Sequence, residues 1–443
     1  MSATVTIPPA QHGVQSEIRM PGDKSISHRA VMFAALAEGE SCIQNCSLGQ
    51  DNRSTIAAFQ SLGVNIVRQD TTMVVNGRGW EGLQPLTQAI QCGNSGTTMR
   101  LLSGILAGCP FTSRLDGDAS LRRRPMGRVT DPLRLMGASI ESEGEEHCAP
   151  LRITGQSGTL KAISYQSPVA SAQVKSAILL AGLRADGQTT IIEPERSRDH
   201  TERLLPAFGG RLHVQERLVS IEGGTLLHAQ DVRVPGDFSS AAFFVGAALL
   251  LPNSELCVRD VGLNPTRTGA LEIFQAMGGW IETHNEREVC GEPVGDIVIR
   301  TSALHGAEID AALVVRAIDE FPIIAIAMAF AQGTSAIRGA QELRVKESDR
   351  LHVLATALGA LGVEVEELPD GLVIQGKERV RGGTVRSHGD HRMAMALTVA
   401  GLASAEGVVI QEPECVDISF PSFYHMIQDL TGVSLAGVNL GEL

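Results

Sequence analysis

The sequence predicts an α/β protein built from six similar helix–strand units, divided into two halves of three units each. Two observations carry this prediction. A pattern of apolar helical residues, a glycine and an alternating stretch recurs along the chain, and a Pro-Gly-Asp motif occurs once in each half. The glycines of the recurring pattern are Gly63, Gly137, Gly209, Gly278, Gly362 and Gly432.

Each copy of the recurring pattern predicts a helix that ends at its glycine and is followed by a strand. Glycine adopts positive φ without the steric cost of a Cβ, so it commonly caps the C-terminus of a helix. The alternation that follows, as in SLGVNIV, is typical of a half-buried strand. The glycines are spaced too widely for a solenoid repeat, with Gly209 to Gly278 the shortest interval. A chance coincidence of six common turns is the alternative.

The Pro-Gly-Asp motif supports the division into halves. It follows Met20 and again Val234, and an alanine-rich segment typical of a helix follows both copies. Lys24 in the first copy is replaced by Phe238 in the second, so the halves are expected to share a scaffold and not a chemistry. Because 443 residues exceed one ordinary hydrophobic core, we expect two domains with a crossover near Gly236.

The composition is that of a folded globular protein without membrane or nucleic-acid partners. Hydrophobic residues make up 43% of the chain, and the net charge of −13 opposes binding to phosphate backbones. The longest apolar stretches, 241–251 and 323–330, are shorter than the roughly 20 residues of a membrane span. The N-terminus lacks a secretory signal, so we expect a cytoplasmic protein. The eight cysteines lack CxxC and zinc spacing, which predicts buried free thiols and no metal site.

Two segments combine the start of a predicted helix with several hydrogen-bond donors. They are PGDKSISHR and QCGNSGTTMR, and an apolar run follows each. Helix N-termini attract anions because their first N–H groups are unpaired and the helix dipole is positive there. A phosphate or carboxylate would fit both segments, whereas capped helices with solvated charges, or a flexible turn, are the alternatives. The candidate residues are Lys24, Ser25, Arg29, Asn94, Gly96 and Thr97.

Further candidates occur in three other motifs. LRRRPMGR contains Arg124, and Pro125 is predicted in the first turn of the helix that follows it. SPVASAQVKSAILLAG adds Ser171 and Gln173, and SRDHTERLL adds Arg198. Arginine runs are usually solvated, but in an acidic chain an arginine fixed by a proline is a good candidate for binding phosphate or carboxylate.

The segment RVKESDRLHVLATAL predicts a helix that begins near Lys346. Lys346 and Arg350 would then lie on one face, where like charges repel unless an anion is near. A salt-bridged surface helix is the alternative, because Glu347 and Asp349 soften the repulsion.

Asp319 and Glu320 precede a very apolar segment, and Arg392 lies at another predicted helix start. A carboxylate beside buried surface has a raised pKa and is a candidate for proton transfer, although structural ion pairs would explain both places equally well. Taken together, the cationic motifs indicate substrates that carry several negative charges.

The motifs resemble those of a known family. PGDKSISHRA, GNSGTTMR, GDASLRRRPMGR, SAQVKSA, RDHTE, RVKESDRL and DHRMAM match EPSP synthase, the 3-phosphoshikimate 1-carboxyvinyltransferase family, in order and spacing. SISHR, SAQVKSA and RVKESDR are most similar to the bacterial subgroup that includes glyphosate-tolerant enzymes. The resemblance implies the enolpyruvyl transferase-like fold, a two-domain inside-out α/β barrel in which each domain has three βαβαββ units around buried helices. It implies domains over 20–234 and over 1–19 plus 235–443, with the active site in the cleft between them.

The resemblance also implies a reaction. The enolpyruvyl group of phosphoenolpyruvate would pass to the 5-hydroxyl of shikimate 3-phosphate, in aromatic amino-acid biosynthesis. The hydroxyl adds to C2 as C3 gains a proton, and phosphate leaves from the tetrahedral intermediate. Asp319 is the candidate for taking the hydroxyl proton and Glu347 for moving the methyl proton, although which carboxylate does which stays open. This chemistry requires no metal and no organic cofactor.

The family motifs also imply which residues hold each substrate. Shikimate 3-phosphate would be bound by Lys24, Ser25, Arg29, Ser171, Arg198, Asp319 and Lys346. Phosphoenolpyruvate would be bound by Gly96, Arg124, Arg350 and Arg392, with Lys24 and Gln173 reaching both substrates. The expected partners are these two small molecules and the inhibitor glyphosate, and we expect a monomer.

Two positions bear on the site and on the alternatives. Some family members carry a lysine just before a Phe-Pro pair, where this chain has Ile418-Ser419. Gly96 stands where glyphosate-tolerant forms carry alanine.

UDP-N-acetylglucosamine enolpyruvyl transferase is one alternative function. It is opposed by the PGDKS opening and by the lack of a cysteine in an Arg-Gly-rich loop before Arg124. A non-catalytic anion-binding scaffold is the other, opposed by the presence of both candidate carboxylates.

Overall fold

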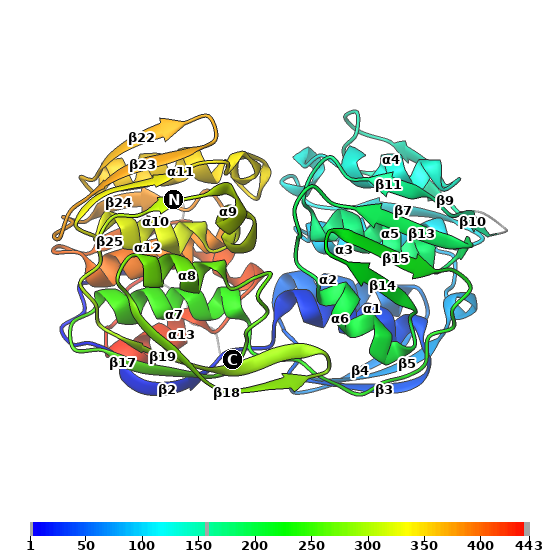
Figure 1. Cartoon of the computed structure of the whole chain (residues 1–443), viewed down its shortest axis with the longest axis horizontal. Coiled ribbons are helices and arrows are strands. Elements are labelled where there is room, and N and C mark those ends of the chain that lie inside the picture. The colour runs from blue at the N-terminus through cyan, green and yellow to red at the C-terminus, as the bar shows by residue number, and fades with distance from the viewer. Residues whose placement is uncertain (1–2, 156–158, 438–443) are drawn as a thin grey trace. The chain divides into compact units, whose positions relative to one another are not determined.

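The computed structural model describes residues 3–155 and 159–437, in which the chain forms two compact units (Figure 1). Unit 1 comprises Met1–Pro21, Gly236–Arg287 and Pro293–Leu443, and unit 2 comprises Gly22–Pro235 and Glu288–Glu292. The main crossings, at Pro21 and Pro235, lie next to the divisions that the Pro-Gly-Asp echo suggested. The return of Glu288–Glu292 to unit 2 was not expected.

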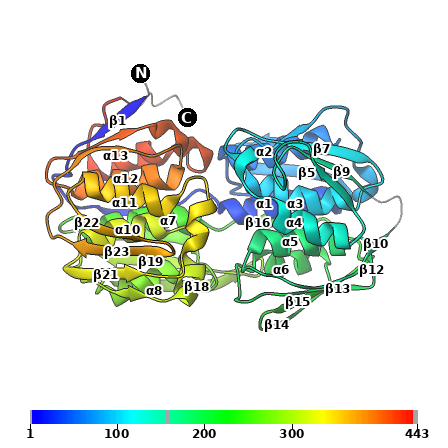
Figure 2. The ribbon, with the colours of Figure 1, turned by 90° about the horizontal axis from the view of Figure 1, so that it is seen from above.

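Helices form the centre of unit 2. The central ones are α1 (Lys24–Leu36), α3 (Gly96–Ala107) and α5 (Ala172–Gly182), and nearly all residues of each are buried. Helices that are apolar or small on all faces are expected in such a core. The half-buried helices of this unit are α2 (Gln50–Ser61) and α4 (Gly127–Leu135), whereas the short α6 (His200–Leu204) is mostly buried. The sheets lie outside the central helices (Figures 1 and 2).

The four-stranded sheets of unit 2 repeat one pairing scheme, in the orders β16-β3-β5-β4, β6-β7-β9-β8 and β11-β13-β15-β14. In each sheet the first pair is parallel and the next two pairs are antiparallel. The strands are β3 (Glu38–Gln44), β4 (Asn65–Gln69), β5 (Thr72–Arg78), β6 (Ile90–Gln91), β7 (Thr112–Asp116), β8 (Ser139–Ser142), β9 (Leu151–Thr154), β11 (Ser164–Gln166), β13 (Gln188–Ile192), β14 (Leu212–Gln215), β15 (Leu218–Glu222) and β16 (Val232–Arg233). The short strands β10 (Leu160–Lys161) and β12 (Ala185–Asp186) pair separately.

Unit 1 repeats this construction around α7 (Phe238–Leu250), α10 (Phe321–Ala329) and α12 (His391–Ala403). Its other helices are α8 (Gly269–Ala276), α9 (Ala311–Ala317), α11 (Arg350–Ala360) and α13 (Phe423–Thr431). Its sheets have the orders β2-β17-β19-β18, β20-β21-β23-β22 and β24-β25-β1. Their strands are β1 (Thr4–Ile7), β2 (Gln15–Arg19), β17 (Glu255–Gly262), β18 (Trp280–Val289), β19 (Glu292–Arg300), β20 (Glu308–Ile309), β21 (Gly333–Ile337), β22 (Glu364–Leu368), β23 (Gly371–Gly376), β24 (Gly383–Arg386) and β25 (Val408–Gln411).

All six glycines of the recurring pattern adopt positive φ, between 66° for Gly432 and 102° for Gly137, so the predicted C-caps are confirmed. A strand follows the first five glycines, namely β4, β8, β14, β18 and β22. After Gly432 the described residues contain only an isolated bridge between Ala436 and Thr6, so the sixth strand prediction is not met there. The third glycine ends a 3-10 helix, Leu205–Phe208, that continues α6.

The two Pro-Gly-Asp copies have the same local structure. Asp23 accepts a hydrogen bond from the Ile26 N–H at the start of α1, and Asp237 accepts one from the Ser240 N–H at the start of α7. An aspartate at the N-cap satisfies a helix N–H that has no partner within the helix. The echo in the sequence therefore reflects equivalent helix starts in the two units.

Two local predictions are wrong. The helix expected near Lys346 begins at Arg350, because Asp349 caps it by accepting from the His352 N–H; Lys346 is extended, so the two cations do not share a helical face. Pro125 is not in a first helical turn, because a 3-10 turn ends before Arg124 and α4 begins only after Met126.

Three observations concern the cysteines, metal sites and membranes. The cysteines of the described residues are all free; five are buried, and Cys42, Cys257 and Cys290 are half-buried, so the prediction of buried thiols holds for most of them. No cluster of three or more metal-binding side chains occurs among the described residues. None of the helices in the described ranges has the length and hydropathy needed to cross a membrane.

Candidate functional site

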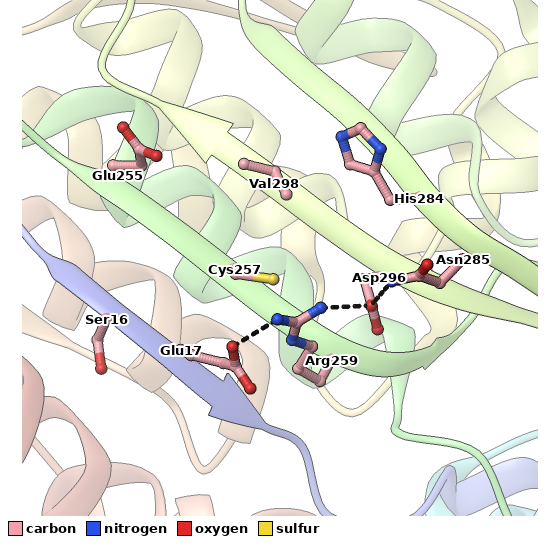
Figure 3. Close-up of a pocket in the computed structure, with 9 residues that line it drawn as sticks. All are labelled: Ser16, Glu17, Glu255, Cys257, Arg259, His284, Asn285, Asp296 and Val298. Carbon is pink, nitrogen blue, oxygen red and sulfur yellow. Dashed lines mark hydrogen bonds and ion pairs between the residues drawn. The ribbon is translucent and has the colours of Figure 1, made fainter.

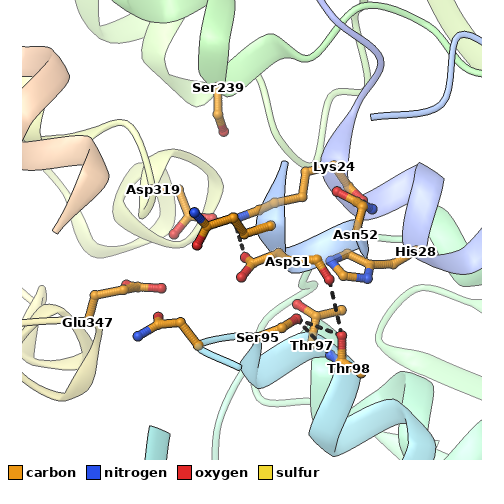
Figure 4. A network of polar contacts seen from close by, with 12 residues as sticks. Lys24, His28, Asp51, Asn52, Ser95, Thr97, Thr98, Ser239, Asp319 and Glu347 are labelled. Carbon is orange, nitrogen blue, oxygen red and sulfur yellow. Dashed lines mark hydrogen bonds and ion pairs between the residues drawn. The ribbon is translucent and has the colours of Figure 1, made fainter. Parts of the chain in front are cut away.

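Lys24 occupies the first turn of α1 in unit 2 and is held by α2. Its Nζ lies 3.0 Å from Asp51 Oδ2, and Asn52 Nδ2 donates to the Lys24 carbonyl at 3.1 Å (Figure 4). The Lys24 side chain is 14% exposed, so its ammonium is directed by Asp51 and not free to sample solvent. Neither Asp51 nor Asn52 was singled out from the sequence.

Arg29 lies one turn further along α1 and is buried. Its Nε donates to Thr201 Oγ1 at 2.8 Å, its Nη2 to Ser176 Oγ at 2.8 Å, and its Nη1 to the Ser25 carbonyl at 2.9 Å. Burial lowers the pKa of Arg29 to about 10, against an opposing effect of Glu202. At neutral pH the guanidinium therefore stays charged in a dry environment.

His28 starts a chain of hydroxyl groups beneath the same helix start. Its Nδ1 lies 2.7 Å from Thr55 Oγ1, which lies 2.7 Å from Thr98 Oγ1. Thr98 in turn donates to Ser95 Oγ, a contact drawn in Figure 4. Burial, assisted by Lys24, lowers the pKa of His28 well below its usual value. A neutral imidazole thus links α1, α2 and the N-terminus of α3.

The N-terminus of α3 brings Asn94, Gly96 and Thr97 together with Arg124. Arg124 Nη2 donates to Asn94 Oδ1 at 2.6 Å, and a Cβ built on Gly96 would lie 3.5 Å from Arg124 Nη1. The same Cβ would lie only 2.9 Å from Arg100 Nη1. Gly96 therefore leaves room for two guanidinium groups beside a helix N-terminus, which is an arrangement suited to an anion.

Gln173, in the first turn of α5, connects this region to Arg100. Its Nε2 donates to Thr97 Oγ1 at 2.8 Å and its Oε1 accepts from Arg100 Nη1 at 2.5 Å. The sequence reasoning missed Arg100, although the residue stands in the quoted motif GNSGTTMR. Ser171 caps α5 by accepting from the Val174 N–H, and the half-buried Arg198 precedes α6.

Lys175, which stands in the SAQVKSA motif, is a structural residue. Its Nζ lies 2.7 Å from Glu193 Oε2 and 2.7 Å from Glu202 Oε1, and all three side chains are buried. Burial alone would lower the pKa of Lys175, but the two carboxylates raise it. This ion-pair cluster joins α5 to α6.

In unit 1 three cations surround Asp319, which precedes α10. Its Oδ1 lies 3.5 Å from Arg350 Nη1 and 3.9 Å from Lys346 Nζ, and its Oδ2 lies 3.6 Å from Arg392 Nη2. The carboxylate therefore lies among three cations, and not only beside the apolar surface that the sequence suggested. Asp319 and Glu347 are both drawn in Figure 4.

Arg350 is fully buried at the start of α11 and is held by two carboxylates. Its Nε donates to Asp390 Oδ2 at 2.8 Å, and its Nη2 donates to Glu347 Oε2 at 2.8 Å. Burial alone would lower the pKa of Arg350, but Asp390 and Glu347 raise it. Arg392, in the first turn of α12, donates to the Asp319 carbonyl at 3.1 Å.

Glu320, which the sequence named with Asp319 as a candidate for proton transfer, forms a further ionic contact next to this group. It is fully buried, accepts from Ser239 Oγ, and lies 3.7 Å from Arg392 Nη1. Arg267 donates to the same Ser239 hydroxyl at 2.9 Å. Ser239 occupies in the second Pro-Gly-Asp copy the position of Ser25 in the first, so the equivalent serine is committed to this internal network.

A hollow of 530 Å³ on the outer sheet of unit 1 is separate from these residues (Figure 3). Its main charges pair with one another, since Arg259 lies 2.6 Å from Glu17 Oε2 and 2.7 Å from Asp296 Oδ2. None of the residues predicted from the sequence lines it. The predicted site residues instead gather at the N-termini of α1, α3 and α5 in unit 2, and at those of α10, α11 and α12 in unit 1.

Comparison with known proteins identifies the family of this chain. The sequence model described as EPSP synthase (3-phosphoshikimate 1-carboxyvinyltransferase) matches residues 9–427. The chain belongs to the EPSP synthase family. It is an enzyme with 3-phosphoshikimate 1-carboxyvinyltransferase activity, which belongs to the shikimate pathway of aromatic amino-acid biosynthesis.

Relatives and solved structures support the EPSP synthase assignment over nearly the full length. The chain is 51% identical to the 3-phosphoshikimate 1-carboxyvinyltransferase of Pelobacter propionicus over 96% of its own length and 98% of the relative. It is 51% identical to that of Desulfitobacterium hafniense over 94% of its own length and 95% of the relative. A solved EPSP synthase from Acinetobacter baumannii superposes with a TM-score of 0.87, at 42% identity, over 98% of this chain and 100% of that one. The fold is shared with the enolpyruvyl transferase NikO from Streptomyces tendae, which superposes with a TM-score of 0.79. The match covers 98% of this chain and 99% of that one, at 18% identity. The predicted fold class is thus confirmed.

Proposed function

We propose that the described helix starts act on phosphoenolpyruvate and shikimate 3-phosphate, and that the transfer uses residues of both units. The observation that carries the assignment of roles is the cationic surrounding of Asp319 by Lys346, Arg350 and Arg392. Seven proposed ligand cations suit two substrates that bear phosphate and carboxylate groups. Binding both substrates in one orientation supplies part of the catalysis, and the cations stabilise the departing phosphate.

The two carboxylates carry the proton transfers in this proposal. Asp319 takes the proton of the substrate 5-hydroxyl and binds the ring hydroxyls of shikimate 3-phosphate. Glu347 delivers a proton to C3 of phosphoenolpyruvate and removes one when phosphate leaves. The hydrogen bond from Arg350 Nη2 to Glu347 Oε2 supports this role, because it fixes the position of the carboxylate beside an arginine that is proposed to bind phosphoenolpyruvate.

The remaining roles follow the substrate charges. Arg350, Arg392, Arg124 and Gly96 bind phosphoenolpyruvate, with Lys24 and Gln173 reaching both substrates. The residues proposed to bind only shikimate 3-phosphate, besides Asp319, are Ser25, Arg29, Ser171, Arg198 and Lys346. Asn94 and Thr97 are also proposed to bind substrate, and their contacts with Arg124 and Gln173 at the same helix start support this.

Further proposals concern the inhibitor, the bacterial subgroup, the cellular location and the oligomeric state. We propose that glyphosate inhibits the enzyme, that the chain is akin to the glyphosate-tolerant bacterial subgroup, and that it works as a cytoplasmic monomer. The missing lysine before Phe420 leaves phosphoenolpyruvate with the cations named above. No metal or organic cofactor enters the proposed steps.

The test is the release of inorganic phosphate from phosphoenolpyruvate, with and without shikimate 3-phosphate. Lys24→Ala should lower the rate that depends on shikimate 3-phosphate at least about a hundredfold, equivalent to roughly 2.7 kcal/mol of transition-state stabilisation. Lys161→Ala, at an exposed lysine of the same unit, is the matched control and should leave the rate unchanged. No release by the wild type would contradict the proposal, and UDP-N-acetylglucosamine would then be tried as acceptor.

A further inference from the structure

Two buried arginines of the proposed site are held in opposite ways. Arg350 is in contact with the carboxylates of Asp390 and Glu347, so the chain itself offsets its charge. Arg29 is equally buried, at 3% exposed, but among the described residues no carboxylate lies within ion-pair distance of its guanidinium. Burying a charge without a counter-ion is costly, which suggests that the counter-ion of Arg29 comes from a ligand.

The neutral partners of Arg29 fix the plane of its guanidinium. Thr201 on α6 accepts from Nε and Ser176 on α5 accepts from Nη2, each at 2.8 Å, and their two hydroxyl oxygens lie 2.7 Å apart. One of these hydroxyls must donate to the other, so lone pairs remain directed at the guanidinium. The Ser25 carbonyl holds Nη1 at 2.9 Å. These three bonds use three of the five guanidinium N–H groups, which leaves two for a ligand.

Hydroxyl acceptors orient a guanidinium without cancelling its charge. A carboxylate in the position of Thr201 would form an ion pair with Arg29 and compete with an anionic ligand. The negative charge with the largest effect on Arg29 is that of Glu202, which is not within ion-pair distance of its guanidinium. Glu202, next to Thr201, is paired with Lys175 at 2.7 Å, which fixes this turn of α6 against α5.

We propose that Thr201, together with Ser176, is a positioning residue that holds Arg29 oriented and uncompensated for an anionic group of shikimate 3-phosphate. This inference rests on the proposed function, in which Arg29 binds that substrate. It assigns a role to the threonine of the RDHTE motif, which the sequence reasoning used only for recognition.

The experiment compares steady-state kinetics of Thr201→Val and Thr201→Ser with the wild type. Valine keeps the shape of threonine and removes the acceptor, so the KM for shikimate 3-phosphate should rise about tenfold or more, while the KM for phosphoenolpyruvate stays within about twofold. Serine keeps the hydroxyl and should restore the KM to within about threefold of the wild type. Equal increases in both KM values, or no rescue by serine, would overturn the proposal.

Thr190→Val is the matched control. Thr190 Oγ1 lies 2.9 Å from Ser220 Oγ in the same unit, so this variant also breaks a hydroxyl pair, but not one at Arg29. It should leave both KM values unchanged; an increase in the KM for shikimate 3-phosphate similar to that of Thr201→Val would overturn the proposal. If Thr201→Val does not fold, Ser176→Ala replaces it, with the same expected rise and the same contradiction by an unchanged KM.

Arg29→Gln separates this inference from the function on which it rests. If Arg29→Gln leaves the KM for shikimate 3-phosphate unchanged, the proposed role of Arg29 is wrong. If Arg29→Gln raises that KM and Thr201→Val does not, the role of Arg29 stands and the positioning role of Thr201 is wrong. If both raise it, and serine rescues Thr201, both proposals are supported.

Discussion

The buried carboxylate of Asp390 connects two arginines of unit 1. Its Oδ2 lies 2.8 Å from Arg350 Nε, and its Oδ1 accepts from the Arg392 backbone N–H at 3.0 Å. Asp390 thereby caps α12 with one carboxylate oxygen and holds Arg350 at the start of α11 with the other. Since Arg350 and Arg392 are both proposed to bind phosphoenolpyruvate, their mutual position depends on a residue that has no proposed contact with substrate.

Asp390→Asn should therefore weaken both stability and phosphoenolpyruvate binding. Asparagine can still cap α12, but it leaves the buried Arg350 with less compensation, and breaking a buried ion pair costs about 3–5 kcal/mol. Urea unfolding and the KM for phosphoenolpyruvate measure the two effects. Asp131→Asn, at an exposed pair with Arg134, is the control and should change stability by under about 1 kcal/mol. An Asp390→Asn variant as stable as the wild type would contradict the interpretation.

Glu347→Gln should lower kcat about a hundredfold or more with little change in the KM for phosphoenolpyruvate. The glutamine carbonyl can still accept from Arg350 Nη2, so the side chain keeps its place but loses its ability to transfer a proton. Steady-state kinetics at saturating shikimate 3-phosphate give both constants. Glu364→Gln, on the exposed side of β22, is the control. A kcat within tenfold of the wild type would remove Glu347 from the proton transfers.

Gly96→Ala should raise the inhibition constant of glyphosate far more than the KM for phosphoenolpyruvate. The new methyl group would lie 2.9 Å from Arg100 Nη1, so the end of that side chain must shift, and the remaining space would suit the smaller substrate better than the inhibitor. Inhibition constants measured against phosphoenolpyruvate provide the comparison. Gly359→Ala, where a Cβ meets nothing within 4 Å, is the control. Equal changes in both constants would contradict the steric argument.

Local sequence signals predicted the helix starts and ends well because each is decided within a few residues. Gly137 ends a helix through its own φ of 102°, and Asp237 caps α7 through the N–H of Ser240, three residues later. The failure at Lys346 has the same origin, because Asp349 competes for the role of N-cap and wins by bonding the His352 N–H. The sequence therefore contains the competing cap, Asp349, three residues after Lys346.

Partners that come from distant segments could not be predicted in this way. Asp51 reaches Lys24 from the next helix, and Arg100 meets Gln173 across 73 residues of sequence. Glu320 was named with Asp319 as a candidate for proton transfer, and its contacts with Ser239 and Arg392 were not predicted. Such pairs follow from the packing of central helices, which a single sequence does not reveal. Family motifs identified the residues at the helix starts but not those that hold them in place.

His28 should make stability depend on pH below about 6.5. It is fully buried, its Nε2 has no partner among the described residues, and burial holds its pKa well below the usual 6.5. At a pH between the pKa of His28 in the folded chain and its pKa in the unfolded chain, the unfolded chain binds a proton at this residue and the folded chain does not. The free energy of unfolding should therefore fall, as pH drops below 6.5, by up to about 1.4 kcal/mol per pH unit.

His28→Asn keeps a partner for Thr55, and its free energy of unfolding should lose this part of the decline between pH 6.5 and 5.5. His12→Asn, at an exposed position, is the control and should retain the decline. Urea unfolding at the two pH values decides the matter, and parallel declines in the wild type and His28→Asn would show that His28 is protonated in the folded protein.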